Sequence, residues 1–323
     1  MRPVPPAPDI PPTAGEGHRP RWSVMIPAYN CAESLAETIR SVLVQAPGQD
    51  QMQVEVVDNA STDDPESVVA GVGAGRVGYY RQPQNVGAIP NFNECILRSR
   101  GDLVHILHDD DYVLPGFYAA IGDLADRYPQ AALFATRSFY VDSSGRITGA
   151  TPLLPEFASG SRDLSAFFYG NPLQCPAVVI RRRFYEQHGG WRPLVPADYE
   201  LWIRAISRGG AVVSPEILAC YRKSEGNQTS SHMRAGTNAR DLFRCARLFE
   251  GVWPDRQVRE LRERAADTAL SQATFFRLHG DREAAAANLK AFSEIATARL
   301  IARRFARRVR DSLLEFKWKV QPW

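Results

Sequence analysis

Three adjacent aspartates, Asp109, Asp110 and Asp111, follow a strand-like stretch at residues 102–107. Carboxylates this close together repel one another, and each resists removal from water. A fold keeps such a group either because a cation binds it or because it remains solvated. Hard divalent cations such as Mg²⁺ and Mn²⁺ prefer oxygen ligands, which aspartate supplies. The alternative interpretation is a solvated turn, or a cap for a helix expected after Pro115.

Alternating strand and helix patterns in the first third of the chain would position these aspartates. Short apolar runs predict strands, and apolar residues three or four apart predict helices between them. The expected strands cover residues 24–26, 53–58, 77–83 and 102–108, and the expected helices cover residues 31–45, 66–72 and 88–100. This order predicts an α/β fold with a Rossmann-like, mostly parallel sheet flanked by helices.

Polar residues follow several of the predicted strands. Asn30, Asp58 and the aspartates at residues 109–111 each come just after a strand. Ligands of open α/β sheets bind beyond the carboxyl ends of the strands. We therefore expect these residues to converge at one edge of the sheet.

The pattern loosens after residue 116. We expect a helix after Pro115, a strand and hairpin at residues 131–149, a strand leading into a short helix at 172–190, a helix near 197–210, and one or two strands at 211–222. From about residue 234 the chain is rich in Ala, Arg, Glu and Leu, which predicts a C-terminal helical extension.

Composition narrows the class of protein. The chain has 323 residues, 44% apolar and 23% charged, which is ordinary for a soluble globular protein. The net charge of +3 does not indicate a nucleic-acid-binding surface. No run approaches the roughly 20 apolar residues of a membrane span. Residues 1–20 are proline-rich and unlike a secretory signal, so we expect a disordered tail on a cytoplasmic protein.

Five short motifs occur in a characteristic order: IPAYN, VVDNASTDD, NVGAIPNFN, LHDDD and ADYELW. Together they resemble family 2 glycosyltransferases of the GT-A fold, over about residues 22–230. The resemblance implies an inverting, metal-dependent transfer of a sugar from a nucleoside-diphosphate sugar (UDP, dTDP or GDP type) to an acceptor hydroxyl. It implies a GT-A domain at 21–232, with a nucleotide-sugar half at 21–112 and an acceptor half at 113–232, before the helical region at 233–323.

The resemblance assigns the acidic run to a divalent cation, Mn²⁺ or Mg²⁺. The family form is Asp-x-Asp-Asp, and His108 stands at its first place. Asp110 is then the expected metal ligand, Asp109 its partner on the donor side, and Asp111 a supporting charge. Such a cation would stabilise the leaving nucleoside diphosphate.

The same resemblance assigns a nucleotide site. Asp58 is expected to accept a hydrogen bond from the base. The residues expected to line the base, ribose or phosphates are Pro27, Ala28, Tyr29, Asn30, Asn85, Gly87 and Asn93. Tyr29 packs either on the base or on the rim, and the asparagines also suit turns and caps. Phe92 stands where the family often has arginine, and Arg81 is an alternative donor contact.

Asp198 is the expected general base, because the resemblance places a catalytic aspartate just before the Leu-Trp pair of ADYELW. Such a carboxylate would take the proton of the acceptor hydroxyl. A helix cap is the compatible structural interpretation of Asp198. Glu200 is the alternative base, ranked lower because it should face another side of the helix.

The acceptor side and closing loop match the family less well. Ser224 stands where many relatives have histidine, and Arg222 or Asn227 would compensate by holding the diphosphate or completing the site. Trp191 is either a platform for a sugar ring or part of the core.

The C-terminal segment at residues 300–320 places apolar residues on one face and arginines on the other. It would either contact a membrane surface peripherally or dock on its own domain or a second subunit, and docking is favoured. Two other functions stay open. One is a non-catalytic sugar- or nucleotide-binding protein, and the other is a nucleotidyltransferase, which the missing glycine-rich phosphate loop disfavours.

Overall fold

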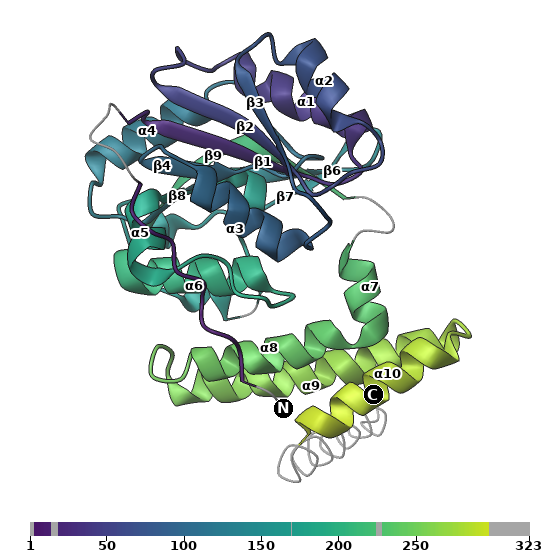
Figure 1. Cartoon of the computed structure of the whole chain (residues 1–323). Coiled ribbons are helices and arrows are strands. Elements are labelled where there is room, and N and C mark those ends of the chain that lie inside the picture. Colours follow the sequence, from purple (N-terminus) through teal and green to yellow (C-terminus); the bar gives the residue numbers. More distant parts are fainter. Residues whose placement is uncertain (1–2, 14–18, 169, 224–227, 297–323) are drawn as a thin grey trace, which may run out of the picture. The chain divides into compact units, whose positions relative to one another are not determined.

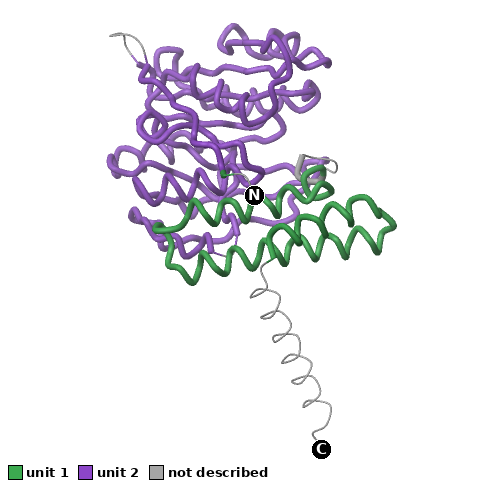
Figure 2. Tube along the Cα trace, turned by 60° about the horizontal axis from the view of Figure 1, so that its bottom comes forward, with its two compact units in different colours: residues 1–3, 226–323 green, residues 4–225 purple. Residues whose placement is uncertain are grey.

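The computed structural model describes residues 3–13, 19–168, 170–223 and 228–296. The chain forms two compact units, shown in Figure 2: the sheet unit, Val4–Glu225, and the helical unit, Met1–Pro3 with Gly226–Trp323. Among the described residues, no helix has both the length and the apolarity needed to cross a bilayer.

Four parallel strands form the first half of the sheet, as predicted. They are β1 (Trp22–Ala28), β2 (Met52–Asp58), β3 (Val77–Arg81) and β4 (Leu103–Ile106), in the order β3-β2-β1-β4. The connecting helices are α1 (Ala32–Leu43), α2 (Pro65–Val72) and α3 (Ala88–Arg98). Helix α3 packs on β1, β2 and β4 and lies in front of the sheet in Figure 1.

The second half makes the sheet mixed. Its elements are β5 (Tyr112–Val113), α4 (Phe117–Arg127), β6 (Leu133–Val141), β7 (Ile147–Ala150), short 3₁₀ turns at Pro155–Phe157, Ser165–Phe167 and Cys175–Ala177, β8 (Val178–Arg181), α5 (Arg182–His188), α6 (Ala197–Gly209) and β9 (Ala211–Arg222). The order continues β4-β8-β6-β9-β5, and β8 runs antiparallel to both β4 and β6. The expected α/β class is confirmed. Parallel pairing is uniform only in the first half, and in the second half β6 and β9 pair in parallel while β5, β7 and β8 pair antiparallel with their neighbours.

The main core covers one face of the sheet. Leu35, Ile39 and Val42 of α1 are fully buried there, at the helical spacing seen in the sequence. Apolar residues of α4 join the same cluster beside alternate residues of β1 and β2. Each such side chain contributes roughly 1.5–3 kcal/mol when fully buried. This core fixes the strand ends that carry the polar residues.

The expected disordered tail is wrong for residues 4–13. Ile10 is only 3% exposed, and this stretch runs beside α5 and the loop after it. The N–H of Gly190 donates to the carbonyl of Pro8 at 2.8 Å, and Arg182 Nη2 donates to the carbonyl of Pro11 at 3.2 Å. Proline lacks an N–H but keeps its carbonyl acceptor, so donors elsewhere in the sheet unit hold the segment in place.

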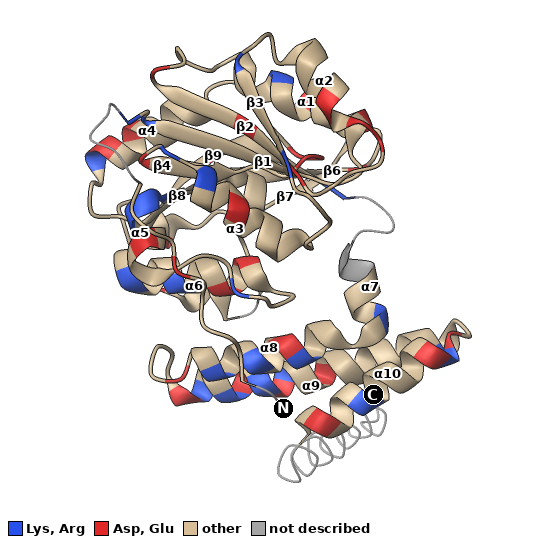
Figure 3. Cartoon of the chain, in the orientation of Figure 1, with Lys and Arg blue, Asp and Glu red and all other residues tan. Residues whose placement is uncertain are grey.

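The helical unit contains α7 (Gln228–Ala235), α8 (Thr237–Leu248), α9 (Asp255–Leu278) and α10 (Arg282–Ile295), in agreement with the predicted helical region. Small side chains of α8, α9 and α10 are buried together, among them Ala239, Ala269 and Ala291. Acidic and basic residues are interspersed along these helices, as the red and blue segments in Figure 3 show. The amphipathic segment at residues 300–320 lies outside the described residues, so its membrane or subunit contact stays a prediction.

Candidate active site

The three aspartates that follow β4 point in different directions. Oδ2 of Asp109 accepts the backbone N–H of Tyr29 at 2.9 Å, so this carboxylate faces the loop after β1. The hydroxyl of Thr38 in α1 donates to the backbone carbonyls of Asp109 and Asp111, at 3.1 and 2.7 Å. Burial raises the pKa of Asp109 to about 6. Helix α1 therefore holds the turn at residues 109–111, and the Asp109 carboxylate is directed to the loop after β1, apart from the carboxylates of the next two aspartates.

His108, Asp110 and Asp111 form the acidic cluster, whose potential ligand atoms all lie within 4.8 Å of one another. Asp111 is fully buried, and its Oδ1 accepts the N–H of Arg222 at 2.8 Å. Within the described structure, Oδ2 of Asp111 and Nε2 of His108 are buried without a hydrogen-bond partner. Burial raises the pKa of Asp111 and lowers the pKa of His108. A positive charge bound at the cluster would compensate for the buried carboxylate of Asp111 and its unpartnered oxygen.

Arg222, at the end of β9, supports the acidic run. Its Nε donates to the carbonyl of Asp110 at 2.9 Å, and its Nη2 pairs with Glu37 of α1 at 2.5 Å. The expected role of Arg222 in holding a diphosphate does not match this geometry, because the guanidinium already braces the turn. Ser224 and Asn227 lie outside the described residues.

Asp58, at the end of β2, is fully buried and already saturated with donors. Its Oδ1 accepts from the N–H and hydroxyl of Ser61. Its Oδ2 accepts from the hydroxyl of Tyr79 and from Nη1 of Arg81, each at 2.8 Å. The expected direct hydrogen bond from a base to Asp58 would require one of these donors to move. Arg81, with a side chain 47% exposed, is the accessible member of the group.

The loop after β1 has a buried and an exposed part. Pro27 and Ala28 are buried in β1 beside β2. Tyr29 is 45% exposed and lies at the rim, where its ring is free to pack on a ligand. Asn30 has a φ of 51°, and its Oδ1 accepts the N–H of Thr62 at 2.9 Å, which fastens the loops after β1 and β2 together.

The predicted asparagines before and within α3 have structural partners. Oδ1 of Asn85 accepts from Asn59 Nδ2 and from the N–H of Gly87, both at 2.9 Å. Gly87 has a φ of 89° where the chain enters α3, a conformation that favours glycine. The amide of Asn93 pairs with the backbone of Trp191 in both directions, at 3.0 and 2.8 Å. Asn93 therefore joins the two halves of the sheet unit.

Trp191 belongs to the core, so its expected role as a platform for a sugar ring is wrong. The side chain is 1% exposed. It contacts Phe92 edge-on at 5.2 Å and Trp202 of α6 at 5.6 Å between ring centroids. Phe92 also stacks on His108 at 5.1 Å. We call these four side chains the aromatic row.

Asp198 lies in the first turn of α6. Its Oδ1 accepts the N–H of Tyr199, and its Oδ2 accepts Nδ2 of Asn171, both at 2.7 Å. Burial raises the pKa of Asp198, and the two hydrogen bonds oppose that rise. Glu200 is 2% exposed and pairs with two arginines at 3.1 and 3.0 Å, so it is not free to act as a base. Sequence reasoning missed Asn171, because asparagine in a loop carries no signal for a distant carboxylate.

The acidic cluster and Asp198 lie near the same side chains. Burial raises the pKa values of Cys175 and Tyr221, and the negative charges of both Asp111 and Asp198 add to each rise. Such a charge effect requires proximity. Asp111 and Asp198 therefore lie within electrostatic range of the same two side chains.

Replacing Asn171 with Ala should move the acid limb of the pH profile of kcat/KM to higher pH. The amide donates to the ionised carboxylate of Asp198, so removing it raises the pKa of that carboxylate, and a base must be ionised to act. A pH profile of Asn171→Ala beside the wild type measures this. An unchanged limb with a lower plateau would contradict it.

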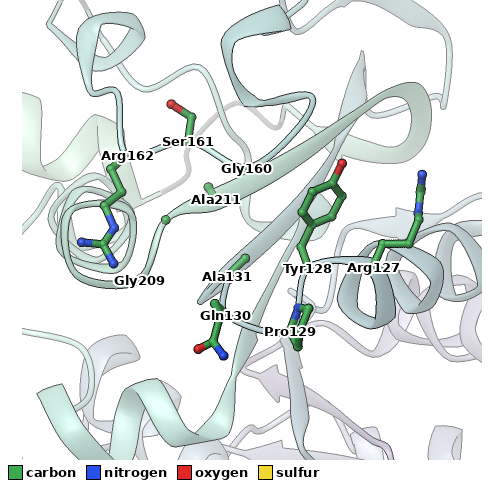
Figure 4. Close-up of a pocket in the computed structure, with 11 residues that line it drawn as sticks. Arg127, Tyr128, Pro129, Gln130, Ala131, Gly160, Ser161, Arg162, Gly209 and Ala211 are labelled. Atoms are coloured by element: carbon green, nitrogen blue, oxygen red, sulfur yellow. The ribbon is translucent and has the colours of Figure 1, made fainter.

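A separate cavity of about 360 Å³, drawn in Figure 4, opens at the amino ends of β6 and β9. Its lining includes Tyr128, Gly160, Arg162 and Gly209. Arg222 and the acidic cluster lie at the carboxyl end of β9, so this cavity is distinct from the candidate active site.

Comparison with known proteins decides the family. The model for glycosyl transferase family 2 matches residues 23–189, which contain the acidic cluster and most of the nucleotide-site candidates. The chain belongs to glycosyl transferase family 2. It is therefore a glycosyltransferase, and the expected family and GT-A-like architecture are confirmed. The ADYELW motif with Asp198 lies beyond the matched residues.

Curated relatives of this family 2 glycosyltransferase are distant. An uncharacterized protein of Mycobacterium tuberculosis is 26% identical, over 70% of this chain and 74% of the relative. The Escherichia coli UDP-Glc:alpha-D-GlcNAc-diphosphoundecaprenol beta-1,3-glucosyltransferase WfaP is 21% identical, over 71% of this chain and 86% of its own length.

Solved structures share the fold of this glycosyltransferase. Residues 1–349 of S. aureus TarS in complex with UDP-GlcNAc match with a TM-score of 0.62 and 18% identity, covering 87% of this chain and 83% of that TarS chain. The mannosyltransferase PcManGT from Pyrobaculum calidifontis, in complex with GDP-Man and Mn²⁺, matches with a TM-score of 0.55 and 18% identity, covering 95% and 83%.

Proposed function

We propose that this glycosyltransferase moves a sugar from a nucleoside-diphosphate sugar to an acceptor hydroxyl with inversion, using Asp198 as the base and a divalent cation. The observation that carries the proposal is the cluster of Asp110 and Asp111 within the family 2 region, where the buried Oδ2 of Asp111 has no hydrogen-bond partner in the described structure. Residues 21–112 would then hold the nucleotide sugar, and residues 113–232 the acceptor. Family membership favours transfer over the nucleotidyltransferase and the non-catalytic binding protein.

The donor would lie beyond β1, β2 and β4. The exposed ring of Tyr29 offers a surface for the base, and Arg81 is the exposed charge beside Asp58. The complexes of TarS with UDP-GlcNAc and of PcManGT with GDP-Man support a nucleoside-diphosphate sugar. They support the UDP and GDP types, and the dTDP type that the motif resemblance also allows is tested beside them.

The acidic cluster fits a divalent cation. The buried Oδ2 of Asp111 has no hydrogen-bond partner in the described structure, and the Asp110 carboxylate lies within the same 4.8 Å group. Asp110 would be the principal ligand and Asp111 the second. When bound, the cation would neutralise charge on the departing nucleoside diphosphate. Asp109, tied to the loop after β1, would position the donor side.

Asp198 would perform the proton transfer. Its hydrogen bonds from Asn171 and Tyr199 N–H favour the ionised carboxylate despite burial. The carboxylate takes the proton as the acceptor oxygen attacks the anomeric carbon. The bond from that carbon to the diphosphate oxygen breaks on the opposite face, so the configuration inverts.

A thermal-shift panel with UDP-, dTDP- and GDP-sugars tests the donor assignment, each with Mn²⁺, with Mg²⁺ and with EDTA. A ligand that binds only the native state raises the melting temperature by mass action. We expect the sugars of one nucleotide type to raise the melting temperature most, and to do so only with Mn²⁺ or Mg²⁺ present. Slow metal-dependent hydrolysis of that donor without acceptor would argue for a catalytic site. No stabilisation by any nucleotide sugar would contradict the proposal.

A further inference from the structure

The three adjacent aspartates at residues 109–111 supply fewer oxygen ligands to the acidic cluster than their number suggests. Asp109 is turned away and bound to the Tyr29 N–H, and one oxygen of Asp111 is held by the N–H of Arg222. Asp110 makes no side-chain hydrogen bond within the described structure, and it has one carboxylate to offer. The remaining polar group that faces the cluster is the imidazole of His108.

The His108 ring is placed and oriented by packing rather than by hydrogen bonds. It stacks on Phe92 at 5.1 Å with an angle of 21° between the rings. Phe92 rests in turn on the buried ring of Trp191. Neither ring nitrogen has a hydrogen-bond partner within hydrogen-bonding distance in the described structure, and Nε2 is buried. A buried imidazole nitrogen without a partner is costly, so a ligand bound at the ring would stabilise this arrangement.

The spacing matches that of ligands around one ion. His108 Nδ1 lies 3.9 Å from Asp111 Oδ2, too far for a hydrogen bond. Two ligand atoms bound at about 2.1 Å to one cation lie at most about 4.2 Å apart. A small closure of the cluster would therefore bring imidazole and carboxylates onto a common ion.

We propose that a ring nitrogen of His108 is a direct ligand of the cation, beside the carboxylates of Asp110 and Asp111. This inference rests on the metal dependence in the proposed function. A nitrogen ligand favours transition metals such as Mn²⁺ over Mg²⁺, which prefers an all-oxygen shell. With His108 as a ligand, the site would therefore bind Mn²⁺ more tightly than Mg²⁺.

The test uses the full-length chain and Mn²⁺ as the probe, with UDP or GDP present. Pulsed electron spin resonance of bound Mn²⁺ detects a directly coordinated nitrogen, and we expect its ¹⁴N modulation in the wild type. His108→Gln should abolish that modulation and lower Mn²⁺ affinity by about ten- to a hundredfold. Mg²⁺ affinity, measured by competition, should fall less. His279→Gln, an exposed histidine on the helical unit, is the matched control and should change nothing.

A second variant separates ligation from folding. His108→Asp restores an oxygen ligand, so it should keep metal binding, lose the nitrogen signal and shift the preference toward Mg²⁺. Wild-type Mn²⁺ binding that depends on Asp110 but shows no nitrogen signal would overturn the His108 assignment alone. Failure of the wild type to bind Mn²⁺ would overturn this inference and the proposed metal dependence together.

Discussion

Asp198→Asn should lower the turnover number by about 10²- to 10⁴-fold, the usual contribution of a general base. The amide has nearly the same shape and can still accept the N–H of Tyr199. It cannot take a proton from the acceptor hydroxyl at neutral pH. Donor affinity should be nearly unchanged, because the proposed nucleotide site lies on β1, β2 and β4. Steady-state kinetics and donor titration by calorimetry measure the two quantities separately.

Asp123→Asn provides the control for Asp198→Asn. It makes the same change of charge at an exposed position on α4 and should leave turnover intact. Retained transfer by Asp198→Asn would overturn the assignment of the base. Equal losses of transfer and donor affinity would instead indicate that Asp198 positions the donor.

Asp110→Asn should remove most metal-dependent donor binding and lower transfer by at least about a hundredfold, because an amide is a weaker ligand for a hard cation. Asp110 is the cleanest member of the cluster to change. Its carboxylate makes no hydrogen bond among the described residues, whereas Asp111 is buried and braced by Arg222. Mn²⁺ titration followed by electron spin resonance gives the affinity, and circular dichroism checks the fold.

Asp109→Asn is the matched comparison for Asp110→Asn. Its side chain binds the Tyr29 N–H, which an amide oxygen also accepts. We therefore expect a much smaller loss of metal affinity at position 109. Equal losses at both positions would show that Asp109 swings into the cluster when metal binds.

The sequence was sufficient to predict where strands end, and so which loops meet. Parallel strands with short connections leave little freedom in this respect, which explains why Asn30, Asp58 and the acidic run share one edge. The direction of each aspartate was beyond sequence reasoning. It depends on Thr38 and Arg222, which are distant in the chain and become neighbours only through packing.

Other site features also depended on tertiary packing. A tryptophan in the sequence can be either an exposed platform for a sugar ring or a buried core residue. Only the fold shows that Trp191 is buried. The order of residues 4–13 depended on donors contributed by α5 and the loop after it, such as Arg182. The antiparallel pairing of β8 with β4 could not be predicted, because β8 lies in the acceptor half, where the alternation of strand and helix patterns is weakest.

The aromatic row would act as a rigid spacer between the proposed metal site and the proposed base. It begins at His108, a member of the acidic cluster, and ends at Trp202, one helical turn after Asp198 on α6. Flat rings in edge and face contact resist compression, so the row would fix the distance between the proposed metal site and the proposed base. Phe92, at the place where the family resemblance led us to expect arginine, contributes a ring contact to this spacing.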